Sequence, residues 1–242
     1  MKLSGSIQYR LHRYFAGNKP LIPVLFIAAM IGFLYSIAPM NVVSGYTLSQ
    51  ILLFCLMVFV ALHMDADSDL TEEQLLFLRA GGSAGFYLSR ELTMAVICLV
   101  YTLAFSLGPV LANITHHFSF FIRPLTLYDV VSGFFFMLCG AVAGGVIGDL
   151  LNSRVVKDRK AGIMVTIVLA VATIASEGIF QEFPRLHLLK ILFFPVMRSA
   201  AYFHEADKIS LLPLLLFWLQ TICFGTLLIW AKILVMKRHR FE

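Results

Sequence analysis

The amino-acid sequence predicts an all-α integral membrane protein with six transmembrane helices. Hydrophobic residues make up 60% of the chain and charged residues only 14%, whereas soluble domains carry about 25% charged residues. The apolar residues gather in six runs of roughly 20 residues, the length that a helix needs to cross a bilayer. Backbone groups in lipid must be paired within a segment, so each run is expected to be a helix. No run alternates as the strands of an outer-membrane barrel do.

The six predicted spans follow one another along the chain. The first ends before the turn residues Pro39 and Asn41, and the second is stopped by Asp65. Segments that contain charged residues separate the remaining four. We therefore expect a single transmembrane domain, 1–242, whose spans are 21–37, 46–64, 92–112, 130–147, 161–180 and 211–235.

The basic residues predict the orientation of these spans. With alternating crossings, fourteen of the nineteen Lys and Arg residues fall on the side of the two termini; the others are Arg123, Arg185, Lys190, Arg198 and Lys208. The positive-inside rule then puts both termini in the cytoplasm, as expected for a multi-pass protein of a bacterial plasma membrane. The net positive charge reflects this topology and contact with anionic membrane lipid, so nucleic acid is not an expected partner.

The N-terminal segment, 1–19, predicts an amphipathic helix at the membrane surface. Leu3, Ile7 and Leu11 fall on one helical face, whereas Arg10 and Arg13 lie elsewhere. Such a helix lies in the interface with its apolar face toward the lipid. Two interpretations stay open at this point, a membrane anchor that helps to set the topology and a mechanical role.

The loop between the second and third spans, 65–91, predicts a short helix. Thr71 and Gln74 have the spacing of a capping box, and Gly81 and Gly82 end the helix that begins at Glu72. Ser83 is expected to cap the next helix, which continues into the third span. Its leucines stand among charges, a surface typical of a docking site for a soluble partner. Packing on a neighbouring loop is the alternative. The candidate docking residues are Glu72, Glu73, Leu75, Leu76, Leu78 and Arg79.

The fourth span carries glycines at every fourth position, Gly140, Gly144 and Gly148. Small residues at this spacing let a second helix approach closely. The pattern leaves open whether that helix belongs to the same chain or to a dimer partner.

The segment between the fifth and sixth spans, 181–208, is too apolar for an exposed loop. Pro184 and Pro195 divide it, and Phe193 and Phe194 precede the second proline. We expect short helices that re-enter the outer leaflet, because irregular backbone survives there only when it packs on protein or a polar cavity. A loop lying on the membrane is the alternative.

Catalytic and metal-binding motifs are not evident in the sequence. It contains no P-loop pattern, the repeat Asp65-Ala-Asp67-Ser-Asp69 lacks the glycine and the distal glutamate of a calcium loop, and His116-His117 lacks companions for a metal. Glu72-Glu73 and Arg79 are spaced differently from the motif of membrane CAAX proteases. We therefore expect neither an enzyme nor a cofactor site in this chain.

The spans themselves contain almost no charge. Lys232 is expected to extend its ammonium group to the inner surface. Transporters driven by protons or sodium usually place ionisable residues at mid-membrane. This scarcity favours ATP-driven transport, with ATP hydrolysis on another chain.

The order of these parts resembles the six-helix permease of the ABC-2 type, the membrane subunit of an ABC exporter. The resemblance covers the whole chain as an architecture and rests in sequence on Thr71–Arg79 with Ser89-Arg90-Glu91, and on the stretch from Phe193 to Arg198. It implies that the helix 72–80 is a coupling helix that docks on a separate ABC ATPase subunit. It also implies that the re-entrant helices between the last two spans form an outer gate, here with Phe193, Phe194 and Pro195.

The resemblance further implies a second permease chain, identical or similar, and ATP with Mg²⁺ on the partner ATPase. The apolar spans suit an amphipathic or hydrophobic cargo such as a peptide, a lantibiotic or a lipid. A membrane scaffold that transports nothing is the main alternative. An intramembrane enzyme is disfavoured because no catalytic constellation is evident.

Overall fold

The computed structural model describes residues 3–64, 74–77, 83–151, 158–183, 193–203 and 206–238. Within these ranges the chain is helical, with a helical turn at 74–77, and the short connections contain one isolated β-bridge. The predicted all-α class is therefore confirmed for the described residues. The helices are α1 (Leu3–Ala16), α2 (Leu21–Leu34), α3 (Val42–Met64), α5 (Ser83–Thr115), α6 (Leu127–Leu150), α7 (Arg159–Glu182), α8 (Val196–Phe203) and α9 (Leu211–Arg238).

Five of the described helices are long and apolar enough to cross a membrane, namely α3, α5, α6, α7 and α9. The first predicted span, 21–37, is shorter than expected, because α2 has 14 residues and ends at Leu34. At 1.5 Å per residue it is about 21 Å long, less than the about 30 Å of the hydrocarbon layer. α1 and α2 meet the criterion only together, and they are bent by 67°. A multi-pass membrane protein is supported, with five described helices that have the length and composition of membrane spans.

The third predicted span, 92–112, is part of a longer helix. α5 begins at Ser83, where the sequence also predicts the start of the helix that continues into this span, and it has 33 residues. Arg90 and Glu91 therefore lie within this helix. At about 50 Å, α5 is longer than the hydrocarbon layer is thick, so one of its ends extends beyond the lipid.

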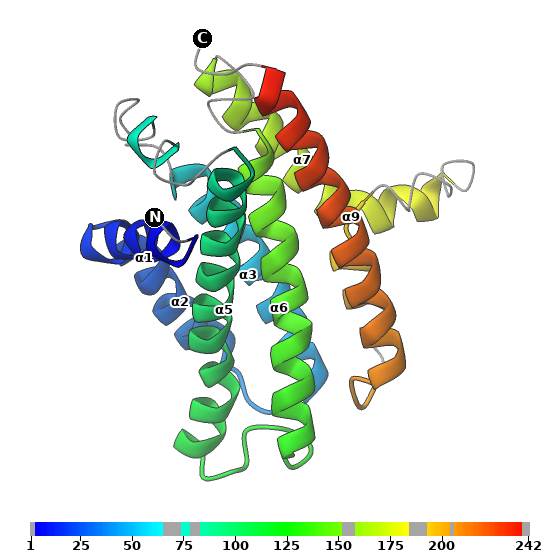
Figure 1. Cartoon of the computed structure of the whole chain (residues 1–242). Helices are drawn as coiled ribbons and strands as arrows, with labels where there is room; N and C mark the ends of the chain where they lie inside the picture. Colours follow the sequence, from blue (N-terminus) through cyan, green and yellow to red (C-terminus); the bar gives the residue numbers. More distant parts are fainter. Residues whose placement is uncertain are drawn as a thin grey trace.

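α6 is the central helix of the bundle. It packs most extensively on α3, and it also contacts α5 and α9; Figure 1 shows α5 and α6 side by side, with α9 leaning away. In its most apolar window 61% of the residues are buried, against 17% in α9. The core between α3 and α6 contains fully buried aromatic side chains, among them Tyr46, Phe54 and Phe136.

The bundle has two distinct ends. One, here called the α1 end, gathers α1, the ends of α3, α6 and α9, and the beginnings of α5 and α7, and both termini lie toward it (Figure 1). At the opposite end the loop after α5 meets the loop after α2. There the Met40 amide donates to the Phe120 carbonyl at 3.1 Å, and the Ile122 amide donates to the Met40 carbonyl at 3.1 Å.

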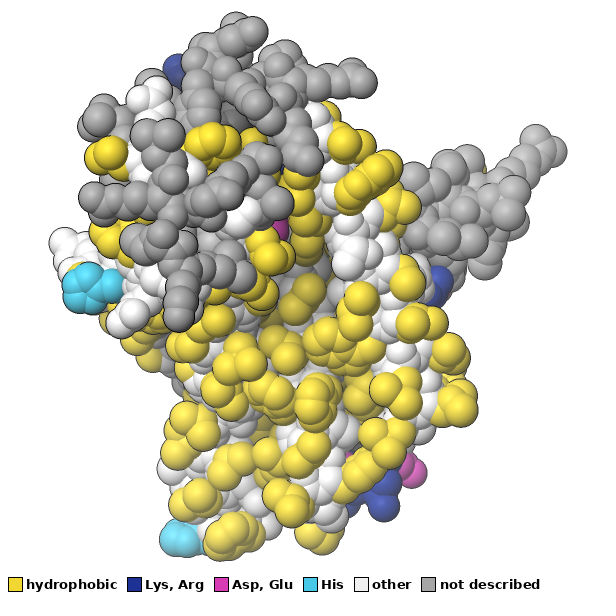
Figure 2. All heavy atoms as spheres, in the orientation of Figure 1, with side chains coloured by type: hydrophobic (Ala, Val, Ile, Leu, Met, Phe, Trp, Pro, Cys, Tyr) yellow, Lys and Arg dark blue, Asp and Glu magenta, His cyan; other side chains and the backbone are white. Residues whose placement is uncertain are grey.

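The outside of the bundle is apolar. Figure 2 shows hydrophobic side chains over most of the described surface of one face, with charged side chains in only a few places. On α5, Leu99, Leu103 and Leu107 are 44–55% exposed and recur at every fourth position, which aligns them along one side of the helix. An apolar surface of this extent is suited to contact with lipid rather than water.

Candidate functional site

The helical turn 74–77 presents one leucine outward and one inward. Leu76 is 7% exposed and forms an apolar cluster with Phe86 and Tyr87 of α5. The Phe77 ring meets the Phe86 ring edge-on at 5.6 Å between centroids. Leu75, in contrast, is 50% exposed. Of the candidate docking residues, Glu72, Glu73, Leu78 and Arg79 lie outside the described residues.

α1 packs across the same part of α5. The Ser6 hydroxyl donates to the Ser89 hydroxyl at 3.2 Å, and the hydroxyls of Tyr14 and Tyr101 share a hydrogen bond of 2.7 Å. The Arg10 guanidinium lies over the Phe86 ring, 4.9 Å from its centroid. Phe86 therefore contacts both α1 and the turn 74–77. The predicted amphipathic helix is bound to the bundle by polar contacts as well as apolar ones.

A buried ionic cluster joins three helices at the α1 end. Arg90 of α5 donates to the Asp149 carboxylate of α6 at 2.6 Å. Lys232 of α9 donates to the Glu91 carboxylate of α5 at 2.6 Å, and it also donates to Asp149. Arg90, Asp149 and Lys232 are 3%, 6% and 4% exposed. Two cations and two carboxylates balance each other, which makes their burial tolerable because each charge has an opposite partner.

The cluster corrects the expectation for Lys232. Its ammonium group does not extend to the surface but is buried between two carboxylates. The sequence did not pair Arg90 or Glu91 with any other residue, and Asp149 was not singled out. The partners are separated by 59 to 141 residues in the chain, so local pattern could not pair them. The sequence shows only that residues of opposite charge occur at the same end of several apolar spans.

The glycines of α6 face α3 of the same chain. A Cβ atom at Gly140 would lie 2.6 Å from the Gln50 side chain, one at Gly144 would lie 2.3 Å from the Phe54 carbonyl oxygen, and one at Gly148 would lie 2.6 Å from the Val58 carbonyl oxygen. These distances leave no room for a side chain, so the glycines allow the two backbones to approach. The question left open by the sequence is answered for this contact, which is intramolecular.

The predicted gate residues pack inside the bundle. Phe194 is 2% exposed and belongs to an apolar cluster with Phe54 and Val58 of α3. Its ring meets the Phe224 ring of α9 edge-on at 4.9 Å. Pro195 is buried as well, and the Phe193 ring lies 5.8 Å from that of Phe180. These contacts lie around the middle of α3 and α9, away from the loops at the opposite end. The function of these residues as a gate stays a prediction.

α8 carries polar groups between the long helices. The Ser199 hydroxyl accepts a hydrogen bond of 3.3 Å from the amide nitrogen of Gln50, which is fully buried in α3. Arg198 donates to the Gln220 side chain of α9, and its guanidinium lies 5.5 Å from the centroid of the Phe217 ring. Arg198 thus has a side-chain partner on α9.

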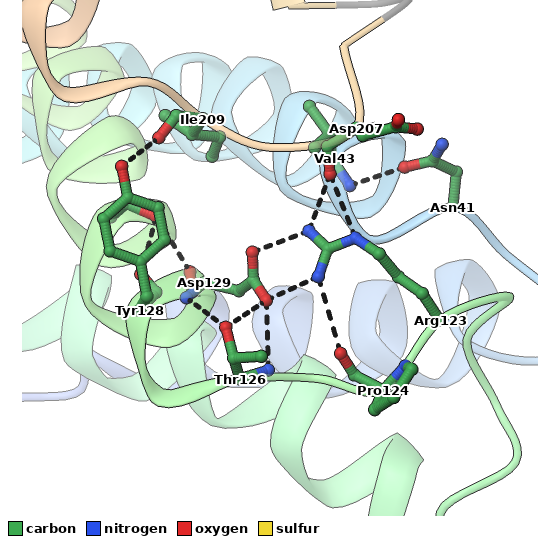
Figure 3. Close-up of polar contacts among 10 residues, drawn as sticks. Asn41, Val43, Arg123, Pro124, Thr126, Tyr128, Asp129, Asp207 and Ile209 are labelled. Atoms are coloured by element: carbon green, nitrogen blue, oxygen red, sulfur yellow. Dashed lines mark hydrogen bonds and ion pairs between the residues drawn. The ribbon is translucent and has the colours of Figure 1, made fainter.

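At the opposite end, Arg123 connects three segments (Figure 3). Its guanidinium donates to both oxygens of the Asp129 carboxylate at 2.6 and 2.7 Å, and it donates to the Asp207 carbonyl at 2.7 and 3.0 Å. The hydrogen bonds with Asp129 raise the pKa of the Arg123 guanidinium above its ordinary value.

The start of α6 is fixed by two further contacts. Thr126 and Asp129 form a capping box there. The Tyr128 hydroxyl donates to the Ile209 carbonyl at 2.7 Å. The segment before α9 is thereby fastened to α6.

Comparisons of the chain with protein-family models, with curated proteins and with solved structures return no match. Among the described residues, no group of three or more His, Cys, Asp or Glu side chains is arranged to hold a metal ion.

Proposed function

We propose that the chain is the transmembrane permease subunit of an ATP-driven exporter of the ABC-2 type. In this proposal it pairs with a second permease chain and binds ATPase subunits on the cytoplasmic side, which corresponds to the α1 end. The bent pair α1–α2 supplies the sixth crossing, with α1 at the interface and α2 entering the lipid. The cargo is amphipathic or hydrophobic, such as a peptide or a lipid.

The observation that carries the proposal concerns the turn 74–77, which packs one side against α5 and exposes the other. Leu76 is held against Phe86 and Tyr87, while Leu75 remains half exposed at the end of the bundle that both termini approach. An exposed leucine on a fixed helical turn is suited to a groove in a soluble partner.

The contacts around this turn supply a path for force. A push on the turn acts on Phe86, which also supports α1 through Arg10. Four residues further along α5, Arg90 is bound to α6 through Asp149. Glu91 is bound to α9 through Lys232. A displacement of the turn would therefore move α1, α5 and parts of α6 and α9 together.

Chemistry in this proposal is divided between two chains. ATP and Mg²⁺ belong to the partner ATPase, and this chain supplies the pathway and the docking surface. Phe193, Phe194 and Pro195 would close the pathway, because the two phenylalanine rings pack against α3, α7 and α9. Movement of α9 through Lys232 would alter that packing, since Phe224 lies on the same helix.

Substitution of Leu75 by Asp tests the docking surface. The full chain is co-expressed with a P-loop ATPase encoded beside it, and stoichiometric co-purification is measured in detergent. We expect Leu75→Asp to lower recovery of the ATPase at least tenfold, because the charge would enter an apolar contact. Leu127→Asp is the matched control, since Leu127 is 80% exposed at the start of α6, at the opposite end.

Equal recovery with both variants would contradict the docking assignment. A chain that associates with no ATPase, and whose gene has no P-loop ATPase beside it, would instead be a membrane scaffold. The test uses Leu75 and not Leu76, because a charge at the buried Leu76 would disturb the fold itself.

A further inference from the structure

A cavity of about 580 Å³ lies at the corner between α1 and α2, against the end of α3 and the start of α7. Its size is within the range of small-molecule sites. Its lining includes Arg13 of α1, Ile22 of α2, Phe59 of α3 and Arg159 of α7. Four helices thus contribute to one pocket at the α1 end.

The lining of this pocket is basic on one part and apolar on another. Arg13, Lys19 and Arg159 contribute three positive charges, and no Asp or Glu occurs among the described lining residues. Ile22, Pro23, Phe59 and Val60 supply an apolar surface beside them. A ligand that fits both parts carries an anionic group and an apolar body. In a membrane protein this combination is the chemistry of an anionic phospholipid.

One of these cations is held in place by a hydrogen bond, and another stands at the start of a helix. Lys19 Nζ donates to the Met64 carbonyl, the last residue of α3, at 2.9 Å, which holds the ammonium group at the pocket. Arg159 is the first residue of α7 and is exposed. A cation in the first turn of a helix is repelled by the partial positive charge of the helix N-terminus. An anion bound nearby would stabilise both the cation and the helix N-terminus.

We propose that this pocket binds the phosphate of an anionic glycerophospholipid, with the beginning of its acyl chains against Ile22 and Phe59. Arg13 and Lys19 also make contacts within the chain, and the bound phosphate shares these side chains with them. A zwitterionic lipid is disfavoured because its headgroup amine would meet three cations. The bound lipid fills the bend between α1 and α2 and fixes the amphipathic helix relative to α3. The proposal holds independently of the docking of an ATPase.

Acidic groups near the pocket are the internal competitors for its cations. Asp158 is the residue before Arg159, and its carboxylate accepts a hydrogen bond from the Lys160 amide at 2.9 Å. Asp65, Asp67 and Asp69 follow Met64 in the sequence and lie outside the described residues. Neutralisation of the pocket by these carboxylates would remove the preference for anionic lipid, and the experiment below detects that outcome.

The experiment measures lipid binding to the purified full-length chain. Native mass spectrometry in detergent compares retention of phosphatidylglycerol with that of phosphatidylcholine of the same chains. We expect Arg159→Gln to reduce the preference for phosphatidylglycerol about fivefold, since each Lys or Arg near a membrane surface contributes about that factor. The triple change Arg13→Gln, Lys19→Gln and Arg159→Gln should abolish it. Lys19→Arg should retain it.

Lys160→Gln is the matched control, because Lys160 is exposed, adjacent in sequence and absent from the pocket lining. An equal loss in this control would show attraction by surface charge alone and would overturn the proposal. No preference in the unaltered chain, or an unchanged preference in Arg159→Gln, would also overturn it. Competition by glycerol 3-phosphate as strong as that by the lipid would assign the pocket to a soluble phosphate compound instead. If the triple variant does not fold, Arg159→Gln alone decides.

Discussion

Lys232 connects α9 to both neighbouring helices at the α1 end of the bundle. Its ammonium group contacts the carboxylates of Glu91 and Asp149, and Asp149 is in turn bound by Arg90. A buried cation between two carboxylates relieves their mutual repulsion. Because α9 is otherwise largely exposed, this side chain contributes much of what fixes its end.

The first prediction concerns the loss of the Lys232 ammonium group. Lys232→Met should lower the free energy of unfolding by about 3–5 kcal/mol, because it leaves buried carboxylates short of a cation. The double variant with Glu91→Gln removes one charge of each sign and should recover part of the loss. Denaturant unfolding in detergent measures both. If the changes in the free energy of unfolding caused by the two substitutions were simply additive, the ionic cluster would be contradicted.

Which of these residues matter was only partly predictable from the sequence. Leu75 and Leu76 were both candidates for docking, but the sequence could not distinguish the exposed side chain from the buried one, because that depends on contact with Phe86. Asp149 and Lys232 are 83 residues apart, and nothing local to either segment predicts their contact.

At the scale of elements, α3 and α6 form the tightest pair. The stripe of Gly140, Gly144 and Gly148 was visible in the sequence, because its four-residue spacing is local; its partner helix was not. Gly133, whose Cβ would lie 2.4 Å from the Tyr46 ring, extends the contact seven residues further and was missed. The end of α2 was also mispredicted, because apolar residues continue past Leu34 to Ile37 although the helix does not.

A pair of alanine substitutions tests this packing. Gly144→Ala should lower stability by about 1–3 kcal/mol, because the new methyl group meets the backbone carbonyl of Phe54 and α3 must move. Gly178→Ala is the matched control in α7. Outside the adjacent residues and the backbone of its own helix, no atom would lie within 4 Å of the new Cβ. There the change should be neutral or stabilising by up to about 1 kcal/mol, as alanine favours helix. Thermal unfolding in detergent measures both, and equal effects would refute the close contact.

At the scale of the whole molecule, the bundle is fastened differently at its two ends. Arg123 and Tyr128 tie the segment before α9 to α6 at the opposite end through hydrogen bonds to backbone carbonyls. At the α1 end, charged side chains connect α5, α6 and α9, and the turn 74–77 rests on α5. A force applied to that turn would reach three long helices, whereas the other end is fixed by its loops. In the proposed function, an ATPase would apply its force at the α1 end.

Cross-linking at residue 75 tests the proposed function most directly. The native cysteines Cys55, Cys98, Cys139 and Cys223 are replaced, and a single cysteine is introduced at Leu75 or at Leu127. Membranes that also contain the neighbouring P-loop ATPase are treated with a maleimide that carries a photoreactive diazirine, which can insert into any nearby side chain, and are then irradiated. We predict a cross-link between the permease and the ATPase from position 75 and none from position 127. Absence of a cross-link at 75, or an equal yield at 127, would contradict the assignment of this chain as the permease of an ABC exporter.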